Sequence, residues 1–531
     1  MTDEGILREG AQFRRRELLI AGAVGGLVLA APVNHAAMAR QRKAPLARGA
    51  FAHGISSGMP KPEGAVLWTR VSDLDRRSRL TLEVAKDPGF RKVVKSKEVI
   101  ADPRVDYTVR HRVGGLEPGR EYYYRFATKN SDSPVGRFRT MPPPDSKEPI
   151  RVAFFSCQSY TQGFYTPHAA LAAEEDIDLV ICVGDYIYEY GSSKALAGRE
   201  DTTGANGDGD VQTLEDYRQK YRLYQADPNL QAMHAAHPIL AVWDDHEVED
   251  NYTANGNSPN QPDPSRDNRD TPRRVPFAER QVNGYRAFFE SMPRFRPKRD
   301  RFGIYGSVRL GGMAELFLTD QRRFRDPMPC NDQTLVQCAE YDQARTMLGP
   351  GQKEWLKRAL PDSDARWKLL GSQLMMMGLE MPKGSPINPD QWDGYKVERS
   401  EILSHFKSRG VNNLAVLSGD IHTFFAGDLT TTGTSDGEPV GVELVGGSIT
   451  STGIPEDLGI PCKTLEGLVQ PNSPHITYAN FDKRGYGVVT LSKNEMIGEF
   501  KTVDSTLTPT SAGSVLASFR VDRGVPKLIR T

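Results

Sequence analysis

The sequence has few cysteines, no net charge and, beyond its first 39 residues, no apolar run long enough to span a membrane. Lys plus Arg and Asp plus Glu each number 68 among 531 residues, so no excess of positive charge draws the chain to nucleic acid. Five cysteines are too few for a disulfide-built scaffold. The length instead suggests two domains, one of them with a large core.

The first 39 residues differ from the rest of the chain. Arg14, Arg15 and Arg16 precede an apolar stretch at 20–31 and an Ala-x-Ala site that ends at Ala39. This pattern predicts a signal peptide and, through the paired arginines, resembles a twin-arginine export signal, although Arg14 stands where that signal usually has Ser or Thr. The alternative, a membrane anchor, is disfavoured because the apolar stretch is short. We therefore expect cleavage near Ala39, the twin-arginine export machinery as a partner, and a periplasmic or secreted protein.

Three short motifs carry the chemistry. They are GDYIY at 184–188, WDDHE at 243–247 and GDIH at 419–422, and each follows an apolar run, at 178–183, 238–242 and 414–417. The runs are typical of buried strands, and a fourth at 151–155 leads to Cys157. A single Asp after a strand often only caps a turn. Four strand ends that each supply a donor instead predict a metal site.

The motifs resemble the metallophosphoesterase signature in the form found in alkaline phosphatase D (PhoD) enzymes. Further similarity lies at 51–58, 67–70, 318–325, 347–356 and 441–449, so the resemblance covers nearly all of the chain after the signal. It implies a metal-dependent phosphohydrolase that acts on a small phosphate ester or phosphodiester by in-line attack of metal-bound hydroxide. It also implies Fe³⁺ together with Ca²⁺, with Mg, Mn or Zn as alternatives at the oxygen-rich position.

The resemblance also assigns the ligands. Iron would be held by a thiolate, a phenolate, a carboxylate and an imidazole, namely Cys157, Asp185, Tyr188 and His422. The second cation would take oxygen donors from Asp185, Asp245 and Asp420, with Gln373 and Asn251 as further candidates. From the sequence alone, Tyr188 is equally well explained as a buried aromatic residue.

The catalytic candidates are His246 and Asp244, beside the predicted ligand Asp245. His246 would bind the phosphate or protonate the leaving alkoxide, and Asp244 would orient it. Arg322, Arg323 and Arg325 follow a predicted strand and could reach phosphate, but a surface salt-bridge cluster is an equal alternative, so none is assigned to the site.

The predicted fold is α+β. Strands at 65–69, 79–85, 107–113, 121–128 and 136–140 indicate a fibronectin/Ig-like β-sandwich at 46–142, followed by a proline-rich linker. The family resemblance implies a four-layer α/β/β/α metallophosphoesterase domain at 147–531. Thr213 and Asp216 predict a capping box at the start of a helix, and Cys330 and Cys338 a disulfide. The polar loops at 195–210 and 255–274 are either lids or mobile segments.

Two other functions stay open at this stage. The first is a phosphodiesterase or phospholipase D-like enzyme, because PhoD relatives act on monoesters and diesters. The second is a surface-binding protein in which the sandwich holds a ligand and the second domain is a degenerate enzyme.

Overall fold

The structure is a computed structural model that describes residues 44–191, 195–256, 275–334, 336–381, 385–386 and 388–531. The predicted signal peptide and most of the 255–274 loop lie outside these ranges. Within them, no helix is long and apolar enough to cross a membrane.

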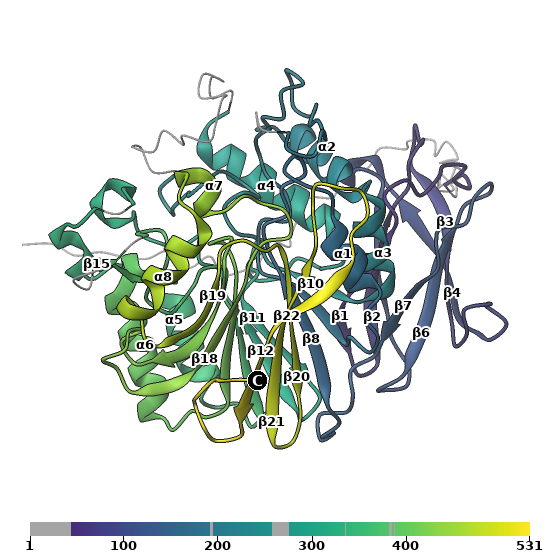
Figure 1. Cartoon of the computed structure of the whole chain (residues 1–531). Helices are drawn as coiled ribbons and strands as arrows, with labels where there is room; N and C mark the ends of the chain where they lie inside the picture. The colour runs from purple at the N-terminus through teal and green to yellow at the C-terminus, as the bar shows by residue number, and fades with distance from the viewer. Residues whose placement is uncertain (1–43, 192–194, 257–274, 335, 382–384, 387) are drawn as a thin grey trace, which may run out of the picture. The chain divides into compact units, whose positions relative to one another are not determined.

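Two large mixed sheets dominate the fold (Figure 1). The ten-stranded sheet runs, in spatial order, β23 (Ile529–Arg530), β22 (Gly513–Asp522), β21 (Glu495–Val503), β20 (Gly485–Leu491), β8 (Ile150–Phe155), β9 (Leu179–Cys182), β10 (Ile239–Ala241), β1 (Ile55–Lys61), β2 (Gly64–Arg70) and β5 (Thr108–Val113). The seven-stranded sheet runs β11 (Gly306–Leu310), β12 (Ala314–Leu318), β13 (Trp367–Gly371), β16 (Leu414–Ser418), β18 (Pro439–Gly446), β17 (Phe424–Thr430) and β19 (Ile476–Asn480).

The main core lies between these two sheets and continues under the helices on the other face of the ten-stranded sheet. Between the sheets it contains, for example, Phe154 and Val489 from one sheet and Leu417 and Leu444 from the other. A second core lies between the seven-stranded sheet and the helices α5 (Gly349–Ala359) and α6 (Lys396–Ser408). The predicted buried strands of the catalytic half are therefore confirmed.

The other helices lie between or after the strands of the two sheets. They are α1 (Thr166–Ala172), α2 (Leu214–Gln225), α3 (Pro228–Ala236), α4 (Phe277–Ser291), α7 (Ile454–Leu458) and α8 (Cys462–Asn472), with the 3₁₀ turns η1 (Pro103–Val105), η2 (Pro329–Asp332), η3 (Ala339–Asp342) and η4 (Trp392–Tyr395). The predicted capping box of α2 is confirmed, since Thr213 Oγ1 accepts from Asp216 N at 3.3 Å and the Asp216 carboxylate accepts from Thr213 N at 3.0 Å.

The N-terminal strands belong to two sheets. β4 (Val93–Ala101), β3 (Ser78–Ala85), β6 (Glu121–Ala127) and β7 (Gly136–Arg139) form a four-stranded sheet, and a separate core joins it to β1, β2 and β5. β1 also pairs in parallel with β10, with Gly58 opposite Ile239. Through this pairing β1, β2 and β5 form one end of the ten-stranded sheet. Sequence periodicity predicted most of these strands but not this continuity, because pairing between distant strands leaves no local pattern.

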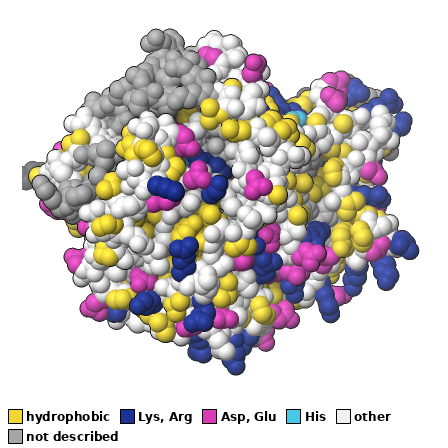
Figure 2. All heavy atoms as spheres, viewed as in Figure 1, with side chains coloured by type: hydrophobic (Ala, Val, Ile, Leu, Met, Phe, Trp, Pro, Cys, Tyr) yellow, Lys and Arg dark blue, Asp and Glu magenta, His cyan; other side chains and the backbone are white. Residues whose placement is uncertain are grey.

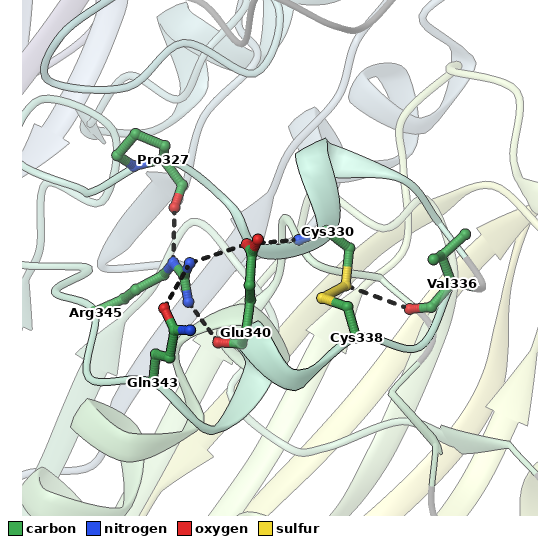
Figure 3. Close-up of a disulfide and its surroundings, with 7 residues drawn as sticks. All are labelled: Pro327, Cys330, Val336, Cys338, Glu340, Gln343 and Arg345. Atoms are coloured by element: carbon green, nitrogen blue, oxygen red, sulfur yellow. Dashed lines mark hydrogen bonds and ion pairs between the residues drawn. A yellow bond between two sulfur atoms is a disulfide. The ribbon is translucent and has the colours of Figure 1, made fainter.

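The predicted disulfide between Cys330 and Cys338 is confirmed (Figure 3). Arg345 stabilises the loop that the disulfide closes, because its guanidinium donates to Glu340 Oε2 at 3.0 Å and to Pro327 O at 3.2 Å. A two-stranded ribbon of β14 (Glu380–Met381) and β15 (Ser385–Pro386) lies elsewhere in the same half of the chain.

The described part of the 195–210 loop is fixed by buried ion pairs. The ammonium of Lys220, fully buried in α2, contacts Asp201 and donates to Gly209 O at 2.6 Å. Arg199 pairs with Asp227 at 2.9 Å. These contacts argue against the mobile-segment interpretation of this loop, and the lid interpretation stays a prediction.

Candidate metal centre

The site residues, of which all but Arg322 were predicted, follow two sets of neighbouring parallel strands. β8, β9 and β10 lie side by side in one sheet and lead to Cys157, Asp185 and Asp245, whereas β12, β13 and β16 lie side by side in the other and lead to Arg322, Gln373 and Asp420. Because the two sheets pack face to face, the carboxyl ends of both sets meet at one edge. The loops that leave the two sheets at this edge are in close contact, because a Cβ on Gly419 would lie 2.2 Å from Ser156 Oγ.

Four chemically different donors gather at the Asp185 carboxylate. Its Oδ2 lies 3.4 Å from Cys157 Sγ and 3.3 Å from Tyr188 Oη, and Tyr188 Oη lies 3.3 Å from His422 Nε2. Cys157, Asp185 and His422 offer ligand atoms within 4.8 Å of one another. A thiol, a carboxylate, a phenol and an imidazole from three loops thus lie next to one another.

The orientation of His422 suits metal binding. Its Nδ1 faces the carbonyl oxygen of Thr452, to which it donates, and this leaves the lone pair of Nε2 directed at Tyr188 and Asp185. Burial and the nearby Arg484 lower the pKa of His422 to about 3, so its ring is neutral at physiological pH. Neutral imidazole is the form that binds metals.

Carboxylates dominate the other side of Asp185. Asp185, Asp244, Asp245 and Asp420 have oxygens within 4.8 Å of one another, and Asp185 and Asp245 form a similar group with His246. Among the described residues, Asp185 Oδ1 and Asp245 Oδ1 are buried without a hydrogen-bond donor. Asp245 Oδ1 lies 3.4 Å from the Arg322 guanidinium, so Asp185 Oδ1 is the oxygen for which a further cation is required, because a buried carboxylate oxygen without a partner is costly.

The electrostatics of the site also call for a cation. Burial, with Asp185 and Asp420, raises the pKa of the Cys157 thiol well above its usual range, and burial with Asp185 and Cys157 does the same for Tyr188. Burial likewise raises the pKa of Asp420 to about 6. A bound cation would stabilise the anionic form of each group, so this donor set fits a metal.

The backbone is strained at the same positions. Left-handed φ values occur at five predicted ligands, namely Cys157 (58°), Asp185 (54°), Asn251 (52°), Asp420 (65°) and His422 (53°). Each such residue costs on the order of 1–3 kcal/mol, and strain of this kind persists mainly where function requires it. Gly184 belongs to the same pattern, since its φ is 135° and a Cβ there would lie 2.4 Å from that of Asp244.

Arg322 is the main site residue that the sequence could not assign. Its fully buried guanidinium contacts Asp244 through Nε, lies 2.6 Å from Asp390 and 2.7 Å from Asp420, and reaches Asp245 at 3.4 Å. Arg325 is also buried and pairs with Asp390 at 2.7 Å. For these two arginines, the alternative of a surface salt-bridge cluster is therefore wrong.

Two glutamates also have functions that the sequence did not reveal. Glu247 accepts from the backbone N–H groups of Asp185 (3.2 Å), Tyr186 (2.7 Å) and Asp244 (2.8 Å), so it joins the first two motif loops. Glu189 Oε2 lies 2.8 Å from His246 Nδ1. Glu247 was visible as the last residue of the WDDHE motif, whereas nothing local identified Glu189.

The remaining candidates lie at the edge of the cluster or behind it. Asn251 donates its N–H to Asp245 Oδ2 at 2.7 Å, and its amide oxygen lies 3.4 Å from Arg322. Asp244 was predicted to orient His246, but its carboxylate contacts Arg322. The carboxylate that contacts His246 is that of Glu189. The side-chain amide of Gln373 contacts Thr319 and the Trp243 carbonyl, which favours a structural role.

Comparisons with known proteins agree with this arrangement. A family model described as "PhoD-like phosphatase" matches residues 152–500, and one described as "PhoD-like phosphatase, N-terminal domain" matches residues 36–142. The chain therefore belongs to the PhoD-like phosphatase family, which supports a metal-dependent phosphohydrolase.

Individual relatives give the same assignment. The chain is 33% identical over 524 residues to "Alkaline phosphatase D" of Bacillus subtilis (strain 168), covering 95% of this chain and 87% of that protein. A solved structure described as "Structure of PhoD" superposes with a TM-score of 0.79 at 32% identity, covering 92% of both chains. Purple acid phosphatase PPD1 from yellow lupin (Lupinus luteus) seeds shares the fold at a TM-score of 0.52 and 12% identity, over 88% of this chain and 73% of that one.

Proposed function

We propose that this chain is an exported alkaline phosphatase D-like enzyme that hydrolyses phosphate esters by in-line attack of hydroxide on phosphorus. The observation that supports this most directly is the chain of contacts that links Cys157, Asp185, Tyr188 and His422, each 3.3–3.4 Å from the next. A thiol and a phenol beside a carboxylate have no evident purpose in a purely structural core, but they suit a strong Lewis acid.

In this proposal, Fe³⁺ is held by Cys157, Asp185, Tyr188 and His422. Ca²⁺, or alternatively Mg, Mn or Zn, is held by Asp185, Asp245 and Asp420, with Asn251 as a further oxygen donor. The amide oxygen of Gln373, the other candidate, already accepts from Thr319 at 3.2 Å. The cations would lower the pKa of a bound water and neutralise the phosphoryl oxygens, which is the chemistry that hydrolysis needs.

The surrounding residues of the chain would position the reactants. Glu189 fixes the His246 ring through Nδ1, and the ring also stacks on Tyr188 with centroids 4.2 Å apart. His246 so held would donate a proton to the leaving alkoxide. Asp244 pairs with the Arg322 guanidinium and keeps it beside the Asp420 carboxylate. From there the guanidinium would face the phosphoryl group of a bound substrate.

Metal analysis of two matched variants tests the proposed iron ligands. The protein is purified without chelator, and Cys157→Ser is compared with Cys182→Ser, a second fully buried cysteine that lies within β9. We expect iron and a visible charge-transfer band in wild type and in Cys182→Ser, and loss of both in Cys157→Ser. An iron-free, colourless and fully active wild type would refute the assignment.

The preference between monoesters and diesters is tested with p-nitrophenyl phosphate and bis(p-nitrophenyl) phosphate. Dominant turnover of the second would favour the phosphodiesterase or phospholipase D-like alternative. Asp185→Asn tests the surface-binding alternative, because a folded variant with unchanged turnover would show that the cluster is not catalytic.

The finer domain assignment is also part of the proposal. We assign 46–142 to a fibronectin/Ig-like sandwich and 147–531 to a four-layer α/β/β/α catalytic domain, supported by the separate cores described above. Residues 1–39 would be a twin-arginine signal. Replacing Arg15 and Arg16 together by lysine should retain the protein in the cytoplasm, and unchanged secretion would exclude that route.

A further inference from the structure

A fully buried lysine in α2, Lys220, has no function in the mechanism above. Its ammonium contacts Asp201 and donates to Gly209 O at 2.6 Å and to Tyr190 O at 3.3 Å. The ammonium has three N–H groups, so these contacts use all of them. Two of the contacts hold the 195–210 loop, and the third holds the carbonyl of the residue that follows Glu189.

The segment 188–190, whose end Lys220 holds, carries the residues that surround His246. Glu189 Oε2 lies 2.8 Å from His246 Nδ1. The Tyr190 ring packs edge-on against the imidazole, with centroids 5.4 Å apart. His246 is therefore held by one carboxylate and one aromatic ring from the same segment, and a shift of that segment would move both contacts.

The backbone of this segment is fixed by the surroundings of Lys220. The Tyr188 N–H donates at 3.2 Å to Tyr224 Oη, which lies one turn along α2 from Lys220. The Glu189 carbonyl accepts from Val211 N at 2.8 Å, directly after the loop that Lys220 holds. Lys220 therefore fixes the segment in two ways, through its own hydrogen bond and through the loop that leads to Val211.

The ammonium also offsets buried negative charge. Glu189 and Lys220 are both fully buried. Burial lowers the pKa of Lys220, whereas the nearby carboxylates of Asp201 and Glu189 act in the opposite direction, which places all three charges close together. Arg280 is a buried cation of the same region, but its guanidinium pairs with Glu249 at 2.8 Å. Loss of the ammonium would therefore leave an excess of buried negative charge beside His246.

We infer that Lys220 is a positioning residue for the proposed general acid, His246. Lys220 keeps the segment 188–190 in place, so that Glu189 and Tyr190 hold the imidazole in the orientation that proton donation requires. The imidazolium gives its Nε2 proton to the leaving oxygen as the P–O bond breaks, and it keeps the Nδ1 proton on the Glu189 carboxylate. Lys220 itself exchanges no proton with the substrate. This inference rests on the proposed phosphohydrolase function and adds a positioning residue to it.

The test uses two monoesters whose leaving groups differ in their need for a proton. p-Nitrophenolate is a stable anion that leaves without protonation, whereas the alkoxide of ethyl phosphate needs a proton as the ester bond breaks. The measured quantity is the ratio of kcat/KM for ethyl phosphate to kcat/KM for p-nitrophenyl phosphate, with metal-loaded enzyme. Lys220→Met should lower this ratio about tenfold, a part of the roughly 10²–10⁴-fold that a general acid contributes.

Arg199→Met is the matched control. It breaks a second buried ion pair of the same loop, the one with Asp227 at 2.9 Å. Among the described residues, the Arg199 guanidinium also donates to Gly163 O at 2.7 Å, and neither partner belongs to the segment 188–190. Arg199→Met should therefore lower stability and leave the ratio unchanged. The iron and calcium contents of each variant are measured alongside, because a merely structural defect would lower them and slow both esters equally.

The His246→Ala background shows whether Lys220 acts through His246. If it does, Lys220→Met should change the ratio far less in that background than in wild type. Asp201→Asn is the second variant, since it weakens the same anchor and keeps the ammonium, and it should lower the ratio in the same direction if Lys220→Met does not fold.

Two results would overturn the inference. One is an equal loss on both esters in the folded Lys220 or Asp201 variant, and the other is an effect of Lys220→Met that is undiminished in His246→Ala. If wild type hydrolyses neither ethyl phosphate nor p-nitrophenyl phosphate nor its bis-ester, the proposed function itself fails, so the two failures are distinguishable.

Discussion

Replacement of Arg322 by leucine is the most informative perturbation of the candidate site. The guanidinium is fully buried and contacts Asp244, Asp245, Asp390 and Asp420. Its removal leaves buried carboxylates without a counter-charge, and breaking a buried ion pair in this way costs about 3–5 kcal/mol. We therefore expect the free energy of unfolding to fall by about that amount.

Urea denaturation measures this loss, on protein treated with chelator and on protein supplemented with Ca²⁺. Because cations can neutralise the same carboxylates, Ca²⁺ should restore more stability to Arg322→Leu than to wild type. The control is Arg323→Leu, the next residue, whose partly exposed pair with Asp300 at 2.6 Å should contribute no more than about 1 kcal/mol. A loss in Arg322→Leu as small as in the control would refute the counter-charge argument.

Three further predictions concern stability. Replacing Cys330 and Cys338 together by serine should lower the free energy of unfolding by about 2–3 kcal/mol, because the disulfide closes a short loop, and reductant should have no effect on the double variant. Burial lowers the pKa of His237 from 6.5 to about 4, so its contribution to stability is complete above pH 6.5 and is lost as the pH falls toward 4. His237→Gln should flatten the acid limb of the stability curve by up to about 3 kcal/mol, and an unchanged limb would contradict this. Gly184→Ala should lower both the melting temperature and the metal content, since its Cβ would collide with Asp244 and its φ is left-handed, and a variant with wild-type metal content would show that the loop can adjust.

The sequence predicted the strand ends well because burial on both faces produces continuous apolar runs. β8, β9 and β16 were identified within one residue of their bounds on this basis. β4 was missed, since its residues are mostly exposed and its Lys, Ser and Glu residues give no apolar alternation. β1 was also missed, because it contains Gly and Pro, which are rare in strands. Its pairing with β2 and β10 holds it in the sheet.

The arginine cluster shows where sequence reasoning stops. Arg322 and Arg325 are fully buried, whereas Arg323 between them is partly exposed. Identical residue types in one loop thus have opposite environments, set by how the chain turns after β12. Asp390 lies 68 positions after Arg322, and neither residue carries a local sign of the other. Only the packing of the two sheets reveals that the guanidinium faces the carboxylates of three other loops.

The position of the site between two sheets has an energetic consequence. Cys157, Asp185 and Asp245 move with one sheet, and Asp420 and His422 with the other, so the core between the sheets fixes the distances among the donors. A cavity in that core would allow the edges of the two sheets to shift relative to each other, although every ligand residue would still be present. Leu444 is fully buried between the sheets, so Leu444→Ala should lower the free energy of unfolding by about 2–5 kcal/mol. It should also lower the affinity for metal. Leu356→Ala is the appropriate comparison, because Leu356 is equally buried but packs in the second core behind the seven-stranded sheet. If both variants lose stability and metal affinity in the same proportion, the donors are held by their own loops and not by the packing between the sheets.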